Sequence, residues 1–232
     1  MAIEAGTSTY YQAKRAIVQD GLQLLLDAGV KDSYVSGDTW YDLSGKNNNA
    51  TLYNTPTYTK LNGGALGFNG TDEYGKVIGG FMYSQMTWAL WIYKQSNDYR
   101  TLISQTATNG FRGDINFYPS KASCRMYSYP QGYSTIYSNS GLSNGQYYYI
   151  VATVNNSNTD AMKLYINGVL QTQTASIVNV GPAGDMWIAA RGYAGPTSHF
   201  GGRIYQFAVH NIELSAQQVL DNYNATRHRF GL

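Results

Sequence analysis

The C-terminal segment 202–232 carries the pattern that most limits how this chain can fold. Polar and apolar residues alternate, which predicts a strand with Ile204, Gln206, Ala208 and His210 on one face and Tyr205, Phe207 and Val209 on the other. Ser215, with Gln218 three positions later, makes the capping box that typically begins a helix. The apolar stripe predicted for that helix consists of Ala216, Val219, Leu220 and Tyr223. We therefore expect a closing strand covered by one short amphipathic helix.

The rest of the chain reads as many short strands separated by turns. The runs with strand character are 21–27, 65–68, 87–93, 101–105, 113–118, 123–129, 147–154, 162–166 and 186–190. Asn167-Gly168 lies between two such runs and is a strong hairpin signal. Without an alternation of strands and helices, the pattern predicts an all-β, two-sheet antiparallel sandwich. We expect an N-terminal arm, 1–20, followed by a single domain, 21–232.

Charge is scarce in this sequence and tyrosine is abundant. Charged residues make up 13% of the 232 residues, the net charge is +2, and there are 22 tyrosines. The one basic cluster, 227–229, follows the predicted helix, so we expect no nucleic-acid partner. An uncharged, tyrosine-rich surface favours contact with protein or sugar. The alternative is that tyrosine serves here only as a strand former.

Cysteine content and hydropathy argue against a disulfide-linked chain and against a membrane-spanning one. Cys124 is the single cysteine, so no disulfide can form within the chain. The N-terminus lacks the basic start and apolar run of a signal peptide, and no apolar run reaches membrane-spanning length. We expect synthesis in the cytoplasm and no membrane insertion.

Several segments, taken in order, resemble the concanavalin A-like lectin/glucanase superfamily in its laminin-G-like jelly-roll branch. They are 21–29, 40–45, 66–74, 87–92, 163–168 and the closing strand and helix from Gly202. The resemblance implies a jelly roll in which the first and last strands pair.

The terminal segments 16–22 and 222–232 are similar to laminin-G-like proteins of tailed bacteriophages. This resemblance implies a non-enzymatic structural or decoration protein of the virion, made in the host cytoplasm. Its partners would be other virion proteins of the capsid, tail or fibre, and further copies of itself. The alternative hypothesis is a lectin-like adhesin that binds a glycan on the host surface.

The sequence gives little support for an enzyme. Glycoside hydrolysis requires two carboxyl groups on opposite sides of the scissile bond. The glutamates are Glu4, Glu73 and Glu213, and no Glu-x-Asp-x-Glu strand is present. We therefore predict no catalytic residues; a degraded glycoside hydrolase is a third hypothesis, which measurable turnover would support.

Calcium deserves separate treatment, because the resemblance implies that many related jelly rolls bind it. Asp42, Asn49 and Asp72 lie in oxygen-rich loops and are the candidate ligands. However, Tyr205 and Gln206 stand where the family's closing strand often has acidic residues. We expect these Asp and Asn side chains to stabilise turns, with no cofactor, and keep calcium binding as the alternative.

A group of tyrosines is the candidate contact surface. Tyr127, Tyr129, Tyr133 and Tyr137 occur with Pro130, Gly132 and several serines, which predicts an exposed loop between strands. Their rings suit a protein interface or a sugar, and one of them is also suited to a place in the core.

Overall fold

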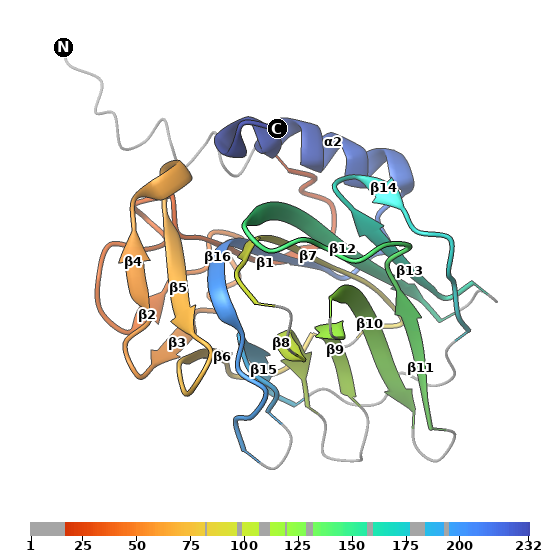
Figure 1. Cartoon of the computed structure of the whole chain (residues 1–232), viewed down its shortest axis with the longest axis horizontal. Helices are drawn as coiled ribbons and strands as arrows, with labels where there is room; N and C mark the ends of the chain where they lie inside the picture. The colour runs from red at the N-terminus through yellow and green to blue at the C-terminus, as the bar shows by residue number, and fades with distance from the viewer. Residues whose placement is uncertain are drawn as a thin grey trace.

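The computed structural model describes residues 17–81, 83–96, 99–106, 112–118, 120–128, 132–156, 160–176, 184–192 and 195–232. Within these ranges the chain forms two antiparallel sheets, each with eight strands (Figure 1). A short C-terminal helix, α2 (Ala216–Thr226), and a 3-10 turn, η2 (Arg227–Phe230), complete the fold. The prediction of a two-sheet antiparallel sandwich with one C-terminal helix is therefore confirmed.

Sheet A contains the long central strands. Its order is β14 (Val169–Leu170), β13 (Met162–Ile166), β12 (Gln146–Asn155), β7 (Gln85–Lys94), β16 (Gly201–His210), β5 (Ala65–Asn69) and β4 (Thr57–Thr59), with β1 (Leu22–Asp27) also paired to β16. A 3-10 turn, η1 (Leu61–Gly63), joins β4 to β5. The predicted hairpin is present between β13 and β14, where Asn167 and Gly168 have φ values of 51° and 80°.

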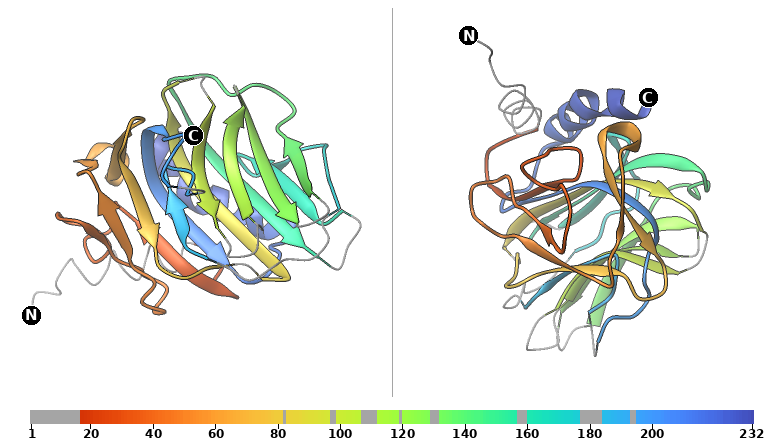
Figure 2. Two further views of the ribbon diagram at one scale, coloured as in Figure 1. Left: turned by 90° about the horizontal axis from the view of Figure 1, so that it is seen from below. Right: turned by 90° about the vertical axis from the view of Figure 1, so that its left-hand side faces the viewer.

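Sheet B faces the inner side of sheet A. Its order is β11 (Gly132–Tyr137), β10 (Lys121–Ser128), β9 (Arg112–Tyr118), β8 (Arg100–Gln105), β15 (Met186–Ile188), β6 (Tyr74–Val77), β3 (Ala50–Tyr53) and β2 (Thr39–Trp40). Figure 2, left, shows this sheet in front and α2 behind it. Sheet B is therefore on the side of the molecule opposite the helix.

The central strands of sheet A are buried on both faces. Its inner face packs on sheet B through side chains such as Leu90, Ile150 and Phe207. Its outer face packs beneath α2 and η2, where Trp91 and Tyr149 meet Val219 and Phe230. Trp91 illustrates how close this packing is, because its ring lies 4.2 Å from that of Phe230 and its Nε1 donates to Thr226 Oγ1 at 2.8 Å.

The closing strand β16 departs from simple alternation. Its pairing with β7 shifts register between Ile204 and Gln206, which inserts one extra residue. Ile204 therefore lies in the inner core with Phe207 and Val209, whereas Tyr205 and Ala208 lie under the helix. The predicted division of this strand into two alternating faces was wrong, because a bulge reverses the side-chain direction at its centre.

The capping box at Ser215 is confirmed, but the predicted apolar stripe was wrong in part. Gln218 N donates to Ser215 Oγ at 3.2 Å and Ser215 N donates to Gln218 Oε1 at 2.9 Å. Ala216 and Leu220 are exposed, while the buried positions are Val219, Asn222 and Thr226. The buried stripe is partly polar because Thr226 and Asn222 bond to groups beneath the helix.

The first and last strands pair, as predicted. β1 runs antiparallel to β16, from Leu22 opposite His210 to Asp27 opposite Gln206. The buried Asp27 carboxylate accepts from Gln206 Nε2 at 2.9 Å and from Arg229 Nη1 at 2.8 Å. One carboxylate thus joins the first strand, the last strand and the turn that follows α2.

Residues 17–20 are the described part of the predicted arm. Ile17 is buried, Val18 N donates to Asn222 Oδ1 at 2.8 Å, and the Val18 carbonyl lies 3.0 Å from His210 Nε2. The remainder, 1–16, is outside the described residues. No helix in the described part of the chain is long and apolar enough to cross a membrane.

Replacement of Ser215 by alanine is expected to lower the free energy of unfolding by about 1 kcal/mol, because the first turn of α2 loses its cap. Urea titration followed by tryptophan fluorescence would measure the change. Ser215→Asp is the control and should retain most of the stability, since aspartate also accepts from the helix N-terminus. Equal losses in both variants would contradict a capping role.

The stability of the fold is expected to fall in mild acid because of His210. Burial lowers the pKa of this imidazole from 6.5, and the bond to the Val18 carbonyl offsets part of that effect. Below about pH 6.5 the unfolded chain therefore binds the proton more readily than the native one, and stability decreases as pH falls toward the native pKa.

The variant His210→Gln keeps a donor for Val18 but does not titrate, so its stability should change less between about pH 7.5 and about pH 5.5. His228→Gln is the matched control, because His228 is exposed on η2. Melting temperatures at both pH values would test this. An unaltered pH dependence in His210→Gln would contradict the assignment.

Candidate functional site

The outer face of sheet B is the candidate site. In β9, Ile115 and Phe117 enter the core, whereas Asp114 and Asn116 alternate with them and lie on the other side of the sheet. Arg125 of β10 pairs with Asp114, so it lies on that side as well. Figure 2, left, looks onto this face, and α2 lies behind the sandwich.

One cross-strand row runs through the middle of this face. Consecutive ladder partners connect Thr51, Lys76, Trp187, Ser104, Asp114, Arg125 and Thr135. Neighbouring strands lie about 4.8 Å apart, so a row of seven strands extends over about 29 Å. The face can therefore accommodate an extended ligand lying across the strands.

The centre of the row is a buried ion cluster. Asp114 is 1% exposed, and its carboxylate accepts from Arg125 Nε at 3.1 Å, from Arg125 Nη2, and from Asn116 Nδ2 at 2.7 Å. Arg191 Nη2 lies 3.7 Å from the same carboxylate. Burial acts to lower the pKa of the Arg125 guanidinium, but Asp114 outweighs burial and raises it. Two guanidinium groups on one carboxylate leave the cluster with a net positive charge.

Aromatic rings lie on one side of this cluster at the β3–β6–β15 end. Tyr53 and Tyr74 stack with ring centroids 4.6 Å apart and planes inclined by 11°. Tyr74 lies 5.3 Å from Trp187, and Lys76 Nζ lies 5.0 Å from the Trp187 ring centre. Tyr53 is 37% exposed, so this stack presents an accessible ring.

A second aromatic group lies beside the cluster, around the end of β9. Tyr99 packs edge-to-face on Tyr118 at 5.6 Å, and Tyr118 lies 6.2 Å from Tyr137. Arg125 Nη2 donates to the Tyr99 hydroxyl at 3.1 Å, which joins this group to the ion cluster. Tyr118 is 55% exposed. The outer face therefore places accessible rings near a charged centre, with Tyr53 across the strands from it and Tyr118 farther along β9.

Two polar atoms of the charged centre have unused bonding capacity. Within the part of the chain that the structure describes, buried Asn116 Oδ1 and Arg191 Nε have no hydrogen-bond partner. Leaving a buried polar atom unpaired costs about 1–3 kcal/mol. Because these atoms are buried, they mark a cost of assembling the charged centre and are not contacts open to a ligand.

The predicted tyrosine loop was wrong, because residues 132–137 form strand β11. Tyr127 and Tyr133 are ladder partners across β10 and β11, and Tyr137 pairs with Ser123. Tyr137 is half-buried beside Tyr118 on the outer face of sheet B. Tyr129 is outside the described residues. The glycine and serines that indicated a loop are outweighed by Tyr133, Thr135, Ile136 and Tyr137, which favour strands.

Sequence reasoning missed the charged centre altogether. Asp114, Arg125 and Arg191 come from distant parts of the chain, and only sheet pairing and the segment after β15 bring them together. The available signal was the alternation in 113–118, where Asp114 and Asn116 occupy alternate positions between apolar residues. That signal predicts polar side chains on one strand face but does not identify their partners.

The calcium candidates serve as acceptors within turns. Asp42 Oδ1 accepts from Leu25 N at 2.9 Å and Ser44 N at 2.8 Å, and Oδ2 accepts from Ser44 Oγ at 2.7 Å and Asn48 N at 3.0 Å. Asn49 Oδ1 accepts from Asp42 N at 2.9 Å.

Asp72, the third candidate, belongs to a different turn, between β5 and β6. There its Oδ1 accepts from Asn69 Nδ2 at 2.8 Å. Among the described residues, no group of three or more His, Cys, Asp and Glu side chains is arranged to hold a metal ion.

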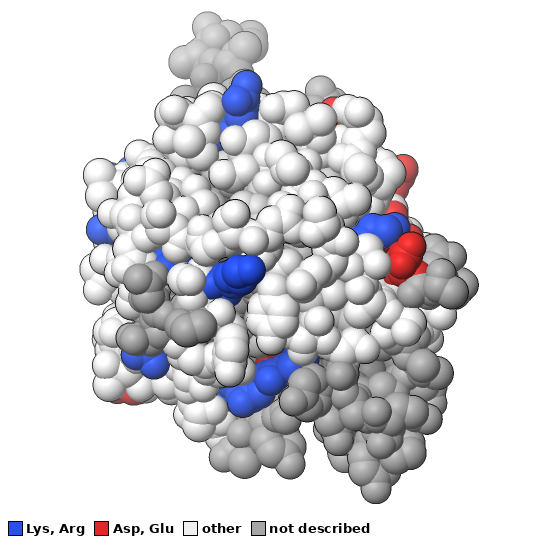
Figure 3. Space-filling model, turned by 45° about the vertical axis from the view of Figure 1, so that its right-hand side comes forward, with Lys and Arg blue, Asp and Glu red and all other residues white. Residues whose placement is uncertain are grey.

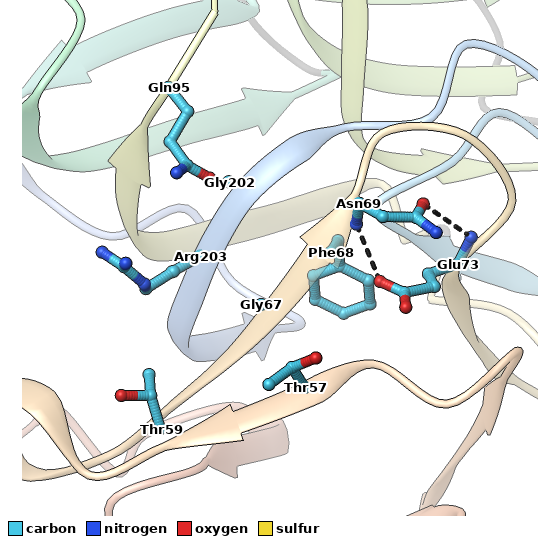
Figure 4. Close-up of a pocket in the computed structure, with 9 residues that line it drawn as sticks. All are labelled: Thr57, Thr59, Gly67, Phe68, Asn69, Glu73, Gln95, Gly202 and Arg203. Atoms are coloured by element: carbon cyan, nitrogen blue, oxygen red, sulfur yellow. Dashed lines mark hydrogen bonds between the residues drawn. The ribbon is translucent and has the colours of Figure 1, made fainter.

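A second hollow lies beside β5 and is called the β5 cleft. It has a volume of about 300 Å³ and opens between β4, β5 and β16 (Figure 4). Its lining consists of Thr57, Thr59, Gly67, Phe68, Asn69, Glu73, Gln95, Gly202 and Arg203. Charged side chains are few on the side of the molecule that Figure 3 shows.

Solved structures similar to this chain include several binding domains. Domain 4 of AbnA, a GH43 extracellular arabinanase from Geobacillus stearothermophilus solved in complex with arabinotriose, aligns with a TM-score of 0.71 and 17% identity over 87% of this chain and 98% of that domain. The binding domain of Paraclostridial Mosquitocidal Protein 1 aligns with a TM-score of 0.71 and 18% identity, covering 89% of this chain and 52% of that one.

The binding domain of botulinum neurotoxin DC, solved in complex with SialylT, aligns with a TM-score of 0.70 and 15% identity, covering 90% of this chain and 52% of that one. This chain thus spans about half the length of the two toxin binding domains. At these identities the likeness concerns the fold alone.

Of the sequence comparisons, the one with family models gives an assignment. No curated protein sequence matches the chain significantly. The family described as the concanavalin A-like lectin/glucanases superfamily matches residues 69–220, which is more than half of the chain. This protein therefore belongs to the concanavalin A-like lectin/glucanase superfamily.

Proposed function

We propose that this domain is a non-enzymatic carbohydrate-binding module and that the outer face of sheet B is its binding surface. The observation that carries the proposal is the row of polar and charged side chains with accessible rings beside it, Tyr53 at its β3 end and Tyr118 farther along β9 from Asp114. Rings stack against the apolar faces of sugars, while guanidinium and amide groups bond to hydroxyls. An extended row suits a glycan chain better than a small compact ligand.

The structural neighbours support a glycan as the ligand class. One is a domain of an arabinanase in complex with arabinotriose, and another concerns the entry of botulinum neurotoxin type C into cells, which depends on two ganglioside molecules. These ligands are properties of those proteins. They favour carbohydrate over nucleic acid or a small cofactor for this chain.

The chemistry of the outer face supports binding without catalysis. Glycoside hydrolysis needs a protonated carboxyl group and a second free carboxylate. Asp114 is ion-paired with Arg125, and Asp185 is ion-paired with Lys76 at 2.6 Å. Burial acts to raise the pKa of Asp185, but Lys76 and the Gly79 N–H outweigh it and hold that pKa below its usual value. A carboxyl group with a lowered pKa is a poor general acid at neutral pH.

Loss of the exposed rings should weaken glycan binding. Tyr53→Ala and Tyr118→Ala each remove one stacking surface worth about 0.5–1.5 kcal/mol, which corresponds to a loss of affinity of about 2-fold to about 13-fold. A glycan array would identify a ligand, and calorimetry with that ligand would measure the affinities of both variants.

The matched control is Tyr41→Ala, because Tyr41 is 51% exposed but lies outside sheet B, after β2. Its affinity should equal that of the unaltered chain. The proposal fails if no glycan binds, or if both Tyr53→Ala and Tyr118→Ala bind as tightly as the control.

The location of the protein on a bacteriophage particle is a separate proposal, and it rests on the terminal segments 16–22 and 222–232 alone. In that setting the domain would contact capsid, tail or fibre proteins and further copies of itself, and a glycan-binding face would serve host attachment. These two functions are compatible, because a glycan on the outer face of sheet B would leave the opposite side of the sandwich, where α2 lies, for contact with other proteins.

Particles of a phage encoding this chain are expected to change in stability, completeness or attachment when they assemble without it. Electron microscopy, heat inactivation and adsorption assays would measure the three properties. Particles unchanged in all three would contradict a virion role but would leave the glycan-binding measurement unaffected.

A further inference from the structure

The β5 cleft is hollow because a glycine lies at its centre. The outer face of sheet A carries a cross-strand row of Thr57, Gly67, Arg203 and Tyr93, which follows from the pairing of β4, β5, β16 and β7. A Cβ added to Gly67 would meet one neighbour, the Thr57 carbonyl, at an ordinary 3.4 Å. Packing therefore does not require glycine at this position, and its missing side chain leaves the space open.

Charges of opposite sign line the two ends of the cleft. Figure 4 shows Glu73 at one end and Arg203 at the other, with Thr57, Thr59 and Gln95 around the space between them. The Arg203 guanidinium lies 4.9 Å from the centre of the Tyr93 ring, which holds it against the sheet. The cleft is therefore preorganised as a polar site with an acceptor end and a donor end.

Glu73 lies in a turn, yet its side chain is buried, because the residue is only 9% exposed. Its Oε2 accepts from Asn69 N at 2.7 Å, and its backbone carbonyl lies 3.3 Å from His199 Nδ1. Burial raises the pKa of Glu73, and the Asn69 N–H offsets part of that rise. The turn between β5 and β6 thus holds a poorly solvated carboxylate at the wall of the cleft, where a hydroxyl donor would stabilise its charge.

From this geometry we propose that the β5 cleft is a second carbohydrate site, which binds one neutral sugar residue through its hydroxyl groups. A sugar hydroxyl both donates and accepts, so one ring can donate to Glu73 and accept from Arg203. Glu73 would repel an anion at one end and Arg203 would repel a cation at the other, and an apolar ligand would leave the polar lining unpaired. The volume of about 300 Å³ is at the lower limit for ligand pockets, which fits a single ring.

This inference rests on the proposed function, because it extends carbohydrate binding to a second surface. The two sites are on different sheets: Arg203 and Gly67 belong to sheet A, whereas Tyr53 and Tyr118 belong to sheet B. Their variants are therefore separable, and each site can fail without the other.

The test uses the full chain and neutral monosaccharides, namely glucose, galactose, mannose, arabinose and N-acetylglucosamine, each added alone and followed by ligand-observed NMR. At least one should bind in the millimolar range. Gly67→Leu, which fills the cleft, and Arg203→Gln, which replaces the charged guanidinium with a shorter neutral amide, should each weaken that binding by about tenfold or more.

Arg227→Gln is the matched control. The Arg227 guanidinium also lies over a tyrosine, 5.7 Å from the centre of the Tyr223 ring, but it is exposed after α2 and outside the cleft. This variant should bind the monosaccharide as the unaltered chain does. Melting temperatures would show whether Gly67→Leu folds, and Arg203→Gln decides the question if it does not.

The proposal is overturned if none of the monosaccharides binds, or if binding survives in Arg203→Gln. Binding of glucuronate in preference to glucose would overturn the assignment to neutral sugars. Glycan-array binding that is lost in Tyr118→Ala while no monosaccharide binds would refute the β5 cleft and leave the outer face of sheet B standing. Monosaccharide binding that is lost in Arg203→Gln, with glycan binding unchanged in both Tyr53→Ala and Tyr118→Ala, would refute the outer face of sheet B alone.

Discussion

The pairing of the closing strand is the constraint on which the rest of the structure depends. β16 pairs with β7 along one edge, and on its other edge it pairs first with β5, over 201–204, and then with β1, over 206–210. The bulge between Ile204 and Gln206 falls where one partner gives way to the next. Because the bulge directs Tyr205 toward the helix while Ile204 and Phe207 stay in the inner core, one irregularity supports both cores.

This arrangement decides which surfaces are open to a ligand. α2 and η2 cover much of the outer face of sheet A, so Trp91 and Tyr149 are core residues. The outer face of sheet B is on the opposite side, where Tyr53 and Tyr118 stay accessible. The helix also leaves the β4–β5 edge of sheet A uncovered, and the β5 cleft lies there because Gly67 supplies no side chain.

The parts of the structure that were predictable from the sequence depend on local turn chemistry or on a strict alternation of polar and apolar residues. The Asn167-Gly168 hairpin, the Ser215 cap and most strands follow from turn chemistry and period-2 patterns. The bulge in β16 was missed because it changes the alternation by a single residue, and β11 was taken for a loop because its glycine and serines masked its strand formers. The ion cluster of Asp114, Arg125 and Arg191 could not be derived, since its members meet only through long-range pairing. The three calcium candidates likewise read as one set, although Asp42 and Asp72 belong to different turns.

Because only 13% of the residues are charged, the few charged side chains that are buried call for an explanation. A buried ion pair contributes little to stability once the cost of desolvation is counted, so burial of Asp114 with two guanidiniums is better explained by positioning than by stability. On sheet B the Asp114 carboxylate is paired with Arg125 and Arg191, so the surface there is rich in hydrogen-bond donors. In the β5 cleft, by contrast, Glu73 and Arg203 line opposite ends, so donor and acceptor are both left for a ligand. The same fold thus offers two polar surfaces of different character, and that difference follows from whether the carboxylate lies against its guanidinium or apart from it.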